Sequence, residues 1–375
     1  MKKIRIGIIY GGRSSEHEVS LASAAAVFRN LAPDRYEAIP IRIEKDGRWT
    51  LPEQPPLLAS AGAVIAAASP PAAAGREAHL VAHPGGETIL SIDRGTSPHV
   101  VTGLSLDVVF PVLHGPYGED GTVQGLLELA NVPYVGAGVL GSAVGMDKAA
   151  MKLVFAASGL PICDYQVVMA RDWRRDEHAT LKTIVDRLGF PLFVKPANLG
   201  SSVGISKASH AAELRAAIEL AAGFDRKVVV EAAVPAAREI EVAVLGNDQP
   251  EASVPGEVVP AREFYDYQAK YLDDDSKLLI PAPLTATQAD DLRRLAVAAF
   301  QAVDCAGMAR VDFLLARDSG IVYVNELNTI PGFTTISMYS MMWAASGLAY
   351  PALLDRLVAL ALERHGEKQR LRTSM

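Results

Sequence analysis

The beginning of the chain constrains its fold most, because an apolar strand signal is followed there by a glycine turn and a helix signal. The segment from Ile4 to Tyr10 is a nearly continuous apolar run, typical of a strand buried on both faces of a parallel sheet. Gly11 and Gly12 then allow the chain to turn. Ser15 and Glu18 have the spacing of a capping box and predict a helix directly afterwards. This order predicts an α/β domain.

Two further strands are predicted in this region, on either side of a segment of unusual composition. The strands are expected at Tyr36 to Ile43 and at Leu106 to Leu113. Between them, Pro52 to Gly103 is rich in Pro, Ala and Gly with little sustained periodicity, which predicts an elaborated surface insertion. The chain has 375 residues. Since domains average ~150 residues, we expect two or three of them.

Composition excludes several classes of protein. Half of the residues are hydrophobic and 21% are charged, so the chain is expected to fold. A net charge of −7 without a long basic block argues against a nucleic-acid partner. The spacing of Cys163 and Cys305 indicates neither a disulfide framework nor a structural zinc site. No apolar segment has the length of a signal peptide or a membrane span, so we expect a cytoplasmic protein without membrane insertion.

A second unit with strands and helices is predicted after a short strand at 131–135. Asp147 is placed to cap a helix from Lys148 to about Ser158. Further strands are predicted at 163–169, 192–195 and 228–231, and helices at about 180–188 and 211–222.

From Glu239 the pattern changes to strands that we expect to pair antiparallel. Polar and apolar residues alternate from Ile240 to Val244, typical of a half-buried strand. Thr287 and Asp290 have capping-box spacing and predict the start of a helix that covers the sheet. A hairpin is predicted from 308–316 and 321–327, and a final amphipathic helix at 351–364. The predicted domains are 1–137, 138–231 and 232–375.

The predicted hairpin carries the most informative group of polar side chains. Arg310 and Asp312 are two residues apart on its first strand, and Glu326 and Asn328 are two apart on its second, so each pair shares one face. We expect Asp312 opposite Glu326 and Arg310 opposite Asn328. Two carboxylates and an amide oxygen are ligands that suit Mg²⁺. The alternative is a solvated face with a surface ion pair.

A lysine at a strand end followed by a glycine and serine loop is the second candidate. Lys195 precedes the segment 196–207, which could offer backbone N–H groups, hydroxyls and a cation to phosphate oxygens. The chain has neither a P-loop sequence nor a dinucleotide-binding glycine pattern after its first strand. The alternative is a flexible connector.

Three further segments could serve a site. The stretch 264–271 contains three tyrosines and a lysine and could close over a substrate as a lid, or it could be an ordinary surface loop. His114 begins a glycine-rich stretch at the carboxyl end of a predicted strand, where open α/β sheets bind ligands. Glu16 lies at the start of the first helix. Both of these could instead be turn and capping residues.

Taken together and in this order, the motifs closely resemble the D-alanine:D-alanine ligase family of the ATP-grasp superfamily. The resemblance spans nearly the whole chain and rests on 11–20, 114–121, Met146-Asp147-Lys148, 195–207, 265–271, Arg310-Val311-Asp312 and 326–332. It implies an α/β and α+β protein of three domains, an ATP-grasp fold preceded by an N-terminal Rossmann-like domain.

The resemblance implies an ATP site between the central and C-terminal domains, with backbone contacts to adenine from 230–234. Some relatives have lysine after the hinge glutamate, whereas this chain has Ala232 after Glu231. The implied ATP-binding residues are Lys148, Lys195, Ser202, Glu231, Ala232, Ala233, Val234, Glu239 and Lys270.

The family resemblance also implies the remaining site residues. The implied metal ligands are Asp312, Glu326 and Asn328, for two Mg²⁺ ions that Mn²⁺ could replace. The implied catalytic residues are Glu16, Ser201, Tyr271, Arg310 and Gly332, with Glu16, Ser201 and Tyr271 in one hydrogen-bond network. The implied substrate-binding residues are Glu16, His114, Arg310, Gly332, Ser337 and Met338.

The activity implied by the resemblance is ATP-dependent joining of two D-alanines through a D-alanyl phosphate, for peptidoglycan precursor synthesis, in a homodimer. Tyr271 in the implied lid favours the dipeptide product over D-alanyl-D-lactate, because the lactate-using relatives lack that tyrosine. The alternatives are a D-alanine:D-lactate ligase, another ATP-grasp carboxylate–amine ligase, and a catalytically silent nucleotide-binding protein. Intact Arg310, Asp312, Glu326 and Asn328 argue against the last of these.

Overall fold

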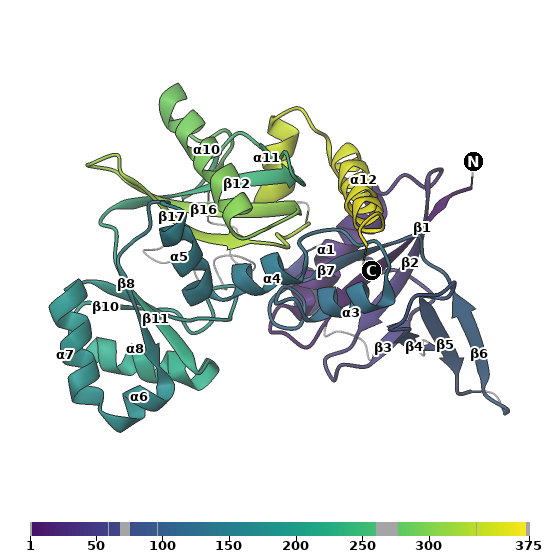
Figure 1. Ribbon diagram of the computed structural model, residues 1–375, viewed down its shortest axis with the longest axis horizontal. Coiled ribbons are helices and arrows are strands. Elements are labelled where there is room, and N and C mark those ends of the chain that lie inside the picture. Colours follow the sequence, from purple (N-terminus) through teal and green to yellow (C-terminus); the bar gives the residue numbers. More distant parts are fainter. Residues whose placement is uncertain are drawn as a thin grey trace.

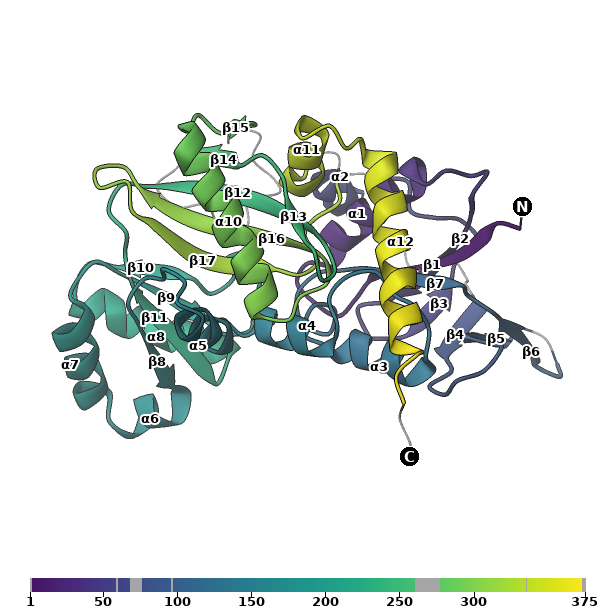
Figure 2. The same ribbon diagram turned by 45° about the horizontal axis from the view of Figure 1, so that its top comes forward.

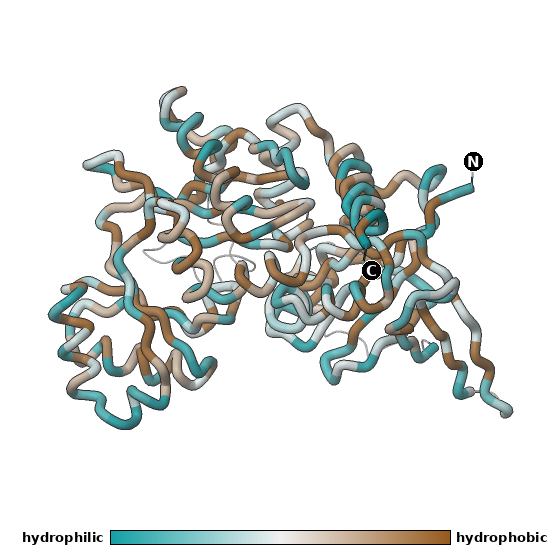
Figure 3. The backbone as a smooth tube through the Cα atoms, in the orientation of Figure 1, coloured by the Kyte–Doolittle hydropathy of each residue, from teal (hydrophilic) through white to brown (hydrophobic). Residues whose placement is uncertain are grey.

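The computed structural model describes residues 2–58, 60–67, 76–95, 97–259, 277–334 and 336–372. Its described strands form three sheets of seven, four and six strands. Figure 1 shows the four-stranded sheet at one end of the molecule and the N-terminal sheet at the other. Many of the strands are hydrophobic along much of their length, and the peripheral helices and loops are more hydrophilic (Figure 3).

The seven-stranded sheet has a parallel centre, as the apolar N-terminal run predicts. β1 (Ile4–Gly11) lies between β2 (Tyr36–Ile43) and β7 (Val108–Leu113) and is parallel to both. Helices α1 (His17–Asn30) and α3 (Thr122–Ala130) follow β1 and β7. The carboxyl ends of β1 and β7 therefore present Gly11, Gly12 and His114 at one edge, where parallel sheets bind ligands.

The segment predicted as a surface insertion extends this sheet with antiparallel strands. They continue outward from β2 in the order β3, β4, β5, β6. β6 is largely exposed, so burial imposes little periodicity on its sequence. The elements are β3 (Trp49–Leu51), α2 (Ala61–Ala66), β4 (Arg76–Leu80), β5 (Ile89–Asp93) and β6 (Val100–Leu104).

Of the three predicted N-terminal helix caps, two are wrong and one is confirmed. The N-cap of α1 is Glu16, not Ser15, and Glu18 pairs with Lys45 instead of closing a capping box. Helix α10 (Ala286–Ala302) has its capping box at Thr285 and Gln288, two residues before the predicted one. Two boxes with the same spacing overlap there, and sequence spacing does not distinguish them. The Asp147 cap is confirmed, as described below.

The four-stranded sheet is antiparallel, and buried residues of helices α7 and α8 pack with its strands in one hydrophobic core. Its strand order is β10, β9, β11, β8. The strand predicted at 131–135 is reduced to one bridge between Val109 and Tyr134. The elements of this part of the chain are α4 (Val139–Met146), α5 (Lys148–Ala157), β8 (Tyr165–Met169), α6 (Ala170–Arg175), α7 (Glu177–Leu188), β9 (Leu192–Pro196), β10 (Ser206–Ala208), α8 (Ala211–Phe224) and β11 (Lys227–Ala232).

The six-stranded sheet contains the predicted hairpin and is covered on both faces. Its elements are β12 (Ala237–Gly246), β13 (Glu251–Ala252), β14 (Gly256–Val259), β15 (Lys277–Leu279), β16 (Gly307–Ala316) and β17 (Val322–Asn328), followed by α11 (Met338–Ala345) and α12 (Tyr350–Lys368). β12 is buried from Ile240 to Gly246, so its predicted half-burial is wrong. Val242 packs in the core with α10, whereas Ala243 packs in the core with α11 and α12.

Helix α12 joins the C-terminal part of the chain to the N-terminal sheet. Its Leu353 and Leu357 belong to the same buried cluster as Ile6 and Val108 of β1 and β7. Figure 2 shows α12 crossing beside these strands. The predicted domain boundaries at 137/138 and 231/232 stay a prediction.

Among the helices in the described ranges, none alone has the length and apolar composition to cross a membrane; α11 and α12 reach them only as a pair, bent by 104° at the break.

Candidate active site

The hairpin has the predicted register, so its four polar side chains lie side by side. Arg310 is opposite Asn328 and Asp312 is opposite Glu326, with an irregularity after Asp312. Arg310 donates from Nε to Asp312 Oδ1 at 2.6 Å and from Nη2 to Oδ2 at 2.7 Å. This two-point contact fixes the plane of the guanidinium group.

A third carboxylate, which the sequence did not single out, completes this cluster. Glu241 of β12 is opposite Asp312 in the sheet, and its Oε2 lies 3.2 Å from Arg310 Nε. Burial acts to lower the pKa of Arg310, but Asp312 and Glu241 outweigh it and hold that pKa well above its usual value. The guanidinium is therefore a permanent, oriented cation. The alternation of Glu241 with buried Ile240 and Val242 was the available signal.

Lys148 lies beside this cluster because Asp147 fixes the start of α5. The Asp147 carboxylate accepts from the N–H groups of Ala149 and Ala150, both at 3.1 Å. Lys148 Nζ donates to Leu199 O at 2.7 Å and lies 3.6 Å from Glu326 Oε2. The first turn of α5 thus places a cation between the glycine-rich loop and β17.

Lys195 is held by a buried ion cluster. Its Nζ donates to Glu231 Oε2 at 2.8 Å and to Asn325 Oδ1 at 3.2 Å. The other oxygen of Glu231 lies 3.1 Å from Nζ of Lys152, which the sequence analysis did not single out. Burial acts to raise the pKa of Glu231, yet the two lysines outweigh it and lower that pKa to about 2. The Glu231 side chain is therefore ionised and directed toward the lysines.

The backbone expected to contact adenine is partly engaged within the protein. Ala232 N–H donates to Asp164 O at 2.9 Å, and Ala233 N–H donates to Pro191 O at 3.0 Å. Nucleotide contacts from 231–234 stay a prediction and would have to use other backbone groups. Glu239 is on β12, opposite Val258 and Leu314.

The glycine and serine loop folds onto Glu16, although 185 residues separate Glu16 from Ser201. The hydroxyl of Ser201 donates to Glu16 Oε1. Ser201 and Ser202 have φ of +49° and +58°, in the left-handed region that non-glycine residues rarely adopt. A Cβ at Gly200 would lie 2.7 Å from Glu16 Oε2, so a side chain at position 200 would displace the Glu16 carboxylate.

His114 is buried in a neutral state between two parts of the chain. Its Nδ1 is 3.1 Å from Ile330 O and its Nε2 is 3.1 Å from Ser23 Oγ. A carbonyl oxygen only accepts, so Nδ1 carries the proton and Nε2 accepts from the serine. Burial is the main cause that lowers the pKa of His114 to about 4. The imidazole therefore orients the site without adding charge at neutral pH.

Glu119 is a second site residue that the sequence analysis did not single out. Its carboxyl oxygens accept from Gly115 N–H at 2.6 Å and from Ile330 N–H at 3.3 Å. Burial, followed by the nearby Glu16, raises the pKa of Glu119 to about 8. Glu119 therefore holds a proton at neutral pH. Its position in the stretch 114–121 was the only signal.

The turn after β17 carries the last predicted residues. Ser337 Oγ accepts from Thr334 N–H at 2.9 Å, and a Cβ at Gly332 would lie 2.9 Å from the same Oγ. Ser337 is also the N-cap of α11, which Met338 begins. Gly332, Ser337 and Met338 therefore lie in one compact turn.

Most of the predicted side chains surround one cavity of about 340 Å³. Asp312, Lys195, Glu231, Ala232, Ala233, Val234 and Glu239 do not line it. Tyr271 and Lys270 fall outside the described residues, as does the predicted lid of 264–271. The predicted residues that line the cavity are Glu16, His114, Lys148, Ser201, Ser202, Arg310, Glu326, Asn328, Gly332, Ser337 and Met338.

The donor set on the hairpin fits magnesium. Asp312, Glu326 and Asn328 offer oxygen atoms, which are the ligands that Mg²⁺ prefers. Both oxygens of Asp312 accept from Arg310, and a carboxylate oxygen has lone pairs for more than one partner. Within the described ranges no group of three or more His, Cys, Asp or Glu side chains is arranged to hold a metal ion without other ligands, so the Asn328 amide oxygen belongs to the donor set.

Family models match most of the chain. The model described as "D-ala D-ala ligase N-terminus" matches residues 5–137, and the one described as "D-ala D-ala ligase C-terminus" matches residues 154–359. Among curated relatives, the D-alanine--D-alanine ligase of Heliobacterium modesticaldum is 50% identical over 99% of this chain and 98% of its own length. That of Geobacillus kaustophilus is 47% identical over 98% of this chain and 97% of its own length.

Solved structures of two ligases also match nearly the whole chain. The D-alanine-D-alanine ligase from Coxiella burnetii matches with a TM-score of 0.83 and 38% identity, covering 99% of this chain and 97% of that one. The D-Ala:D-Ser ligase from Enterococcus faecalis matches with a TM-score of 0.78 and 34% identity, covering 96% of this chain and 100% of that one. The expected fold class is confirmed.

Proposed function

Since this chain belongs to the D-alanine–D-alanine ligase family, we propose that it joins two D-alanine molecules into a dipeptide at the expense of ATP. One observation supports this most strongly. Residues from the N-terminal sheet, the glycine and serine loop and the hairpin surround a single cavity, which is large enough for small substrates.

ATP would bind with its phosphates near Lys148 and Lys195, beside the hairpin. Asp312, Glu326 and Asn328 would hold Mg²⁺, which neutralises phosphate charge when bound. The loop at Ser201 and Ser202 lies next to Lys148 through the Leu199 carbonyl, so it is placed to cover the phosphates. These assignments support transfer of the γ-phosphoryl group to a carboxylate, with release of ADP.

The first D-alanine would bind beside Glu16. A carboxylate at Glu16 would suit the ammonium group of an amino acid, and the neutral His114 and protonated Glu119 add no competing charge. The D-alanine carboxylate would accept the phosphoryl group and become an acyl phosphate. Closure of the surrounding loops would exclude water, which otherwise hydrolyses an acyl phosphate.

The second D-alanine would bind by the turn after β17, with its carboxylate near Ser337 and Met338. Its amine would attack the acyl carbon and displace inorganic phosphate. Arg310 and the N–H of Gly332 would stabilise the oxyanion that develops on that carbon. Because Arg310 is oriented by Asp312 and Glu241, little reorganisation is needed when the negative charge forms.

A coupled assay of ADP release tests the proposal. ADP release is expected with ATP, Mg²⁺ and D-alanine, and Glu326→Ala is expected to reduce it strongly because a metal ligand is lost. D-lactate and D-serine, each added with D-alanine, are the competing second substrates. Release only in the presence of D-lactate or D-serine would contradict the dipeptide product, and absence of release with every substrate would favour a silent nucleotide-binding protein.

We also propose a use for the product, a location for the enzyme and an oligomeric state. The dipeptide would serve peptidoglycan precursor synthesis, and Mn²⁺ could replace Mg²⁺ in the assay. The cytoplasm fits an ATP-consuming reaction and the two free cysteines, Cys163 and Cys305. The family favours a homodimer. Light scattering after size-exclusion chromatography measures the mass in solution, and a mass equal to one subunit would contradict the homodimer.

A further inference from the structure

The ion cluster around Glu231 contains a lysine for which the proposed function has no use so far. Lys152 is on α5, one turn after Lys148, and is 1% exposed. A charged lysine is rarely buried to this extent unless it is paired. Its Nζ lies 3.1 Å from Glu231 Oε1 and 5.8 Å from the centre of the Tyr165 ring. The contact with Glu231 is an ion pair whose atoms are not aligned as a hydrogen bond.

The cluster connects three parts of the fold. Lys152 comes from α5, Lys195 from β9 and Glu231 from β11. Glu231 is opposite Phe193 in the sheet, so Lys195 is its diagonal neighbour two residues further along β9. Long side chains bridge such diagonal positions. Lys195 also reaches Asn325 of β17, in the other sheet.

The charges of these three side chains do not balance. Two ammonium groups share one carboxylate, which leaves one positive charge in excess among these three side chains. Glu326, at the cavity, is the next carboxylate that acts on Lys195. A buried net charge is costly unless an anion compensates for it. With Lys152 absent, the carboxylate would belong to Lys195 alone and would neutralise it.

We propose that Lys152 is a positioning residue of the nucleotide site: by sharing the Glu231 carboxylate, it keeps the positive charge of Lys195 for the phosphates of ATP. The inference rests on the proposed function, because it needs a nucleotide beside Lys195. Lys152 acts through Glu231 and does not itself touch the nucleotide.

The test compares nucleotide affinity in variants of the full chain. Lys152→Met removes the charge but keeps the apolar stem. It is expected to raise both the Kd for ADP, measured by calorimetry with Mg²⁺, and the KM for ATP by about tenfold, because the Glu231 carboxylate is then no longer shared and neutralises Lys195. The KM for D-alanine is expected to stay the same. Lys152→Arg keeps the charge and should stay within about threefold of wild type. Lys182→Met, in the exposed face of α7, is the matched control.

A double-mutant cycle separates this role from packing and from direct contact. In a Glu231→Gln background there is no carboxylate to share, so Lys152→Met should change the Kd for ADP less than about twofold. An effect of equal size in both backgrounds would overturn the proposal, because packing or direct contact would persist without the carboxylate. Unchanged ADP affinity in folded Lys152→Met would overturn it as well.

Lys152→Met could fail to fold, because it leaves Glu231 with one partner fewer, and Lys152→Gln is then the second neutral variant. If neither folds, the double variant Lys152→Met with Glu231→Gln is compared with Glu231→Gln alone. If the Kd for ADP of the folded double variant is within about twofold of that of Glu231→Gln, the result supports a role through the shared carboxylate. A tenfold difference between these two Kd values would overturn the proposal. ADP binding without D-alanine turnover in wild type would overturn the proposed function but leave this test intact.

Discussion

Two neighbouring carboxyl groups, those of Glu16 and Glu119, show how burial assigns different roles to one residue type. Glu16 receives the Ser201 hydroxyl, whereas Glu119 accepts two backbone N–H groups between His114 and the turn after β17. Like charges this close to each other disfavour double ionisation, so one group keeps its proton. The protonated Glu119 holds the backbone of Gly115 and Ile330 without adding charge. In the proposed mechanism, Glu16 binds the substrate ammonium.

The proton on Glu119 predicts a pH-dependent stability. Its pKa is about 8 in the folded protein and lies near 4.5 when the chain is unfolded. Between pH 4.5 and pH 8, the Glu119 carboxyl therefore holds its proton in the folded state but not in the unfolded state. The stability that this proton contributes is complete below pH 4.5 and is lost as the pH rises through about 8. We expect the free energy of unfolding in urea to fall between pH 6 and pH 8, by on the order of 1 kcal/mol per pH unit from this group. Glu119→Gln should remove that slope, and an equal slope in the variant would exclude Glu119 as its cause.

The Ser201 hydroxyl is expected to matter for the first D-alanine. Ser201→Ala removes its hydrogen bond to Glu16, so the loop no longer holds that carboxylate. A hydrogen bond to a charged group contributes about 1.5 to 3 kcal/mol, which predicts a rise of roughly tenfold or more in the KM for the first D-alanine. Ser209→Ala, on the exposed chain before α8, is the control and should leave initial-rate kinetics unchanged. Equal kinetics in both variants would argue against the contact.

At the scale of elements, α5 organises the cationic side of the site. Its N-cap Asp147 accepts two backbone N–H groups and also pairs with Lys227. The helix then places Lys148 at the cavity and Lys152 one turn further on, at the ion cluster. Because α5 is one rigid element, its start determines the position of both ammonium groups.

Loss of the Asp147 cap is expected to reduce stability. Asp147→Ala should lower the free energy of unfolding by about 1 to 2 kcal/mol, since it leaves two N–H groups without an acceptor and Lys227 without a partner. Asp147→Asn keeps an acceptor and should lose less. Asp176→Ala, which removes an exposed cap from α7, is the comparison. Chemical denaturation measures all three, and an equal loss for the Ala and Asn variants at 147 would assign the effect to Lys227 alone.

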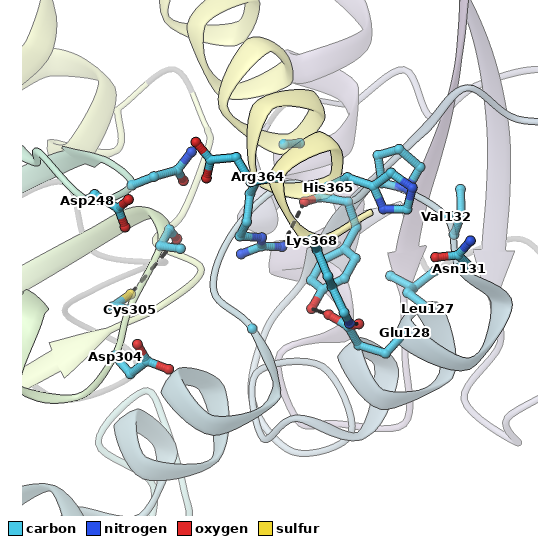
Figure 4. Close-up of a pocket in the computed structure, with 17 residues that line it drawn as sticks. Leu127, Glu128, Asn131, Val132, Asp248, Asp304, Cys305, Arg364, His365 and Lys368 are labelled. Carbon is cyan, nitrogen blue, oxygen red and sulfur yellow. Dashed lines mark hydrogen bonds and ion pairs between the residues drawn. The ribbon is translucent and has the colours of Figure 1, made fainter. Parts of the chain in front are cut away.

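At the scale of the whole molecule, the C-terminal helix holds the two ends of the chain together. α12 shares a buried core with β1 and β7, and Arg364 extends from it over the ring of Tyr134, 4.6 Å away. Arg364 donates to the carbonyl groups of Tyr134 and Gly136, just before α4. It borders a cavity of about 210 Å³ between α12 and α3 (Figure 4).

Removal of this contact should lower the stability of the protein. Arg364→Ala is expected to lower the free energy of unfolding by about 1 to 3 kcal/mol, because two carbonyl groups lose a charged donor. Lys368→Ala, on the same helix, breaks a more exposed ion pair with Glu128 and should cost less than about 1 kcal/mol. Thermal and urea unfolding of both variants checks this order. A larger loss for Lys368→Ala would contradict it.

Much of this protein was determined by its local sequence. The apolar run of β1, the Asp147 cap and the register of Asp312 with Glu326 follow from periodicity and short spacings, and all three are confirmed. The family motifs also identified most side chains of the cavity. Periodicity reports which face of an element a residue occupies, and that is enough for such features.

Only the tertiary structure decided which charges meet. No short motif links Glu241 to Arg310, Lys152 to Glu231 or Glu119 to Ile330, and the members of each pair are separated by tens to hundreds of residues. The burial of β12 on both faces likewise depends on α10, α11 and α12 packing against it. A side chain's charge state depends on the groups that surround it in space, and local spacing does not contain that information.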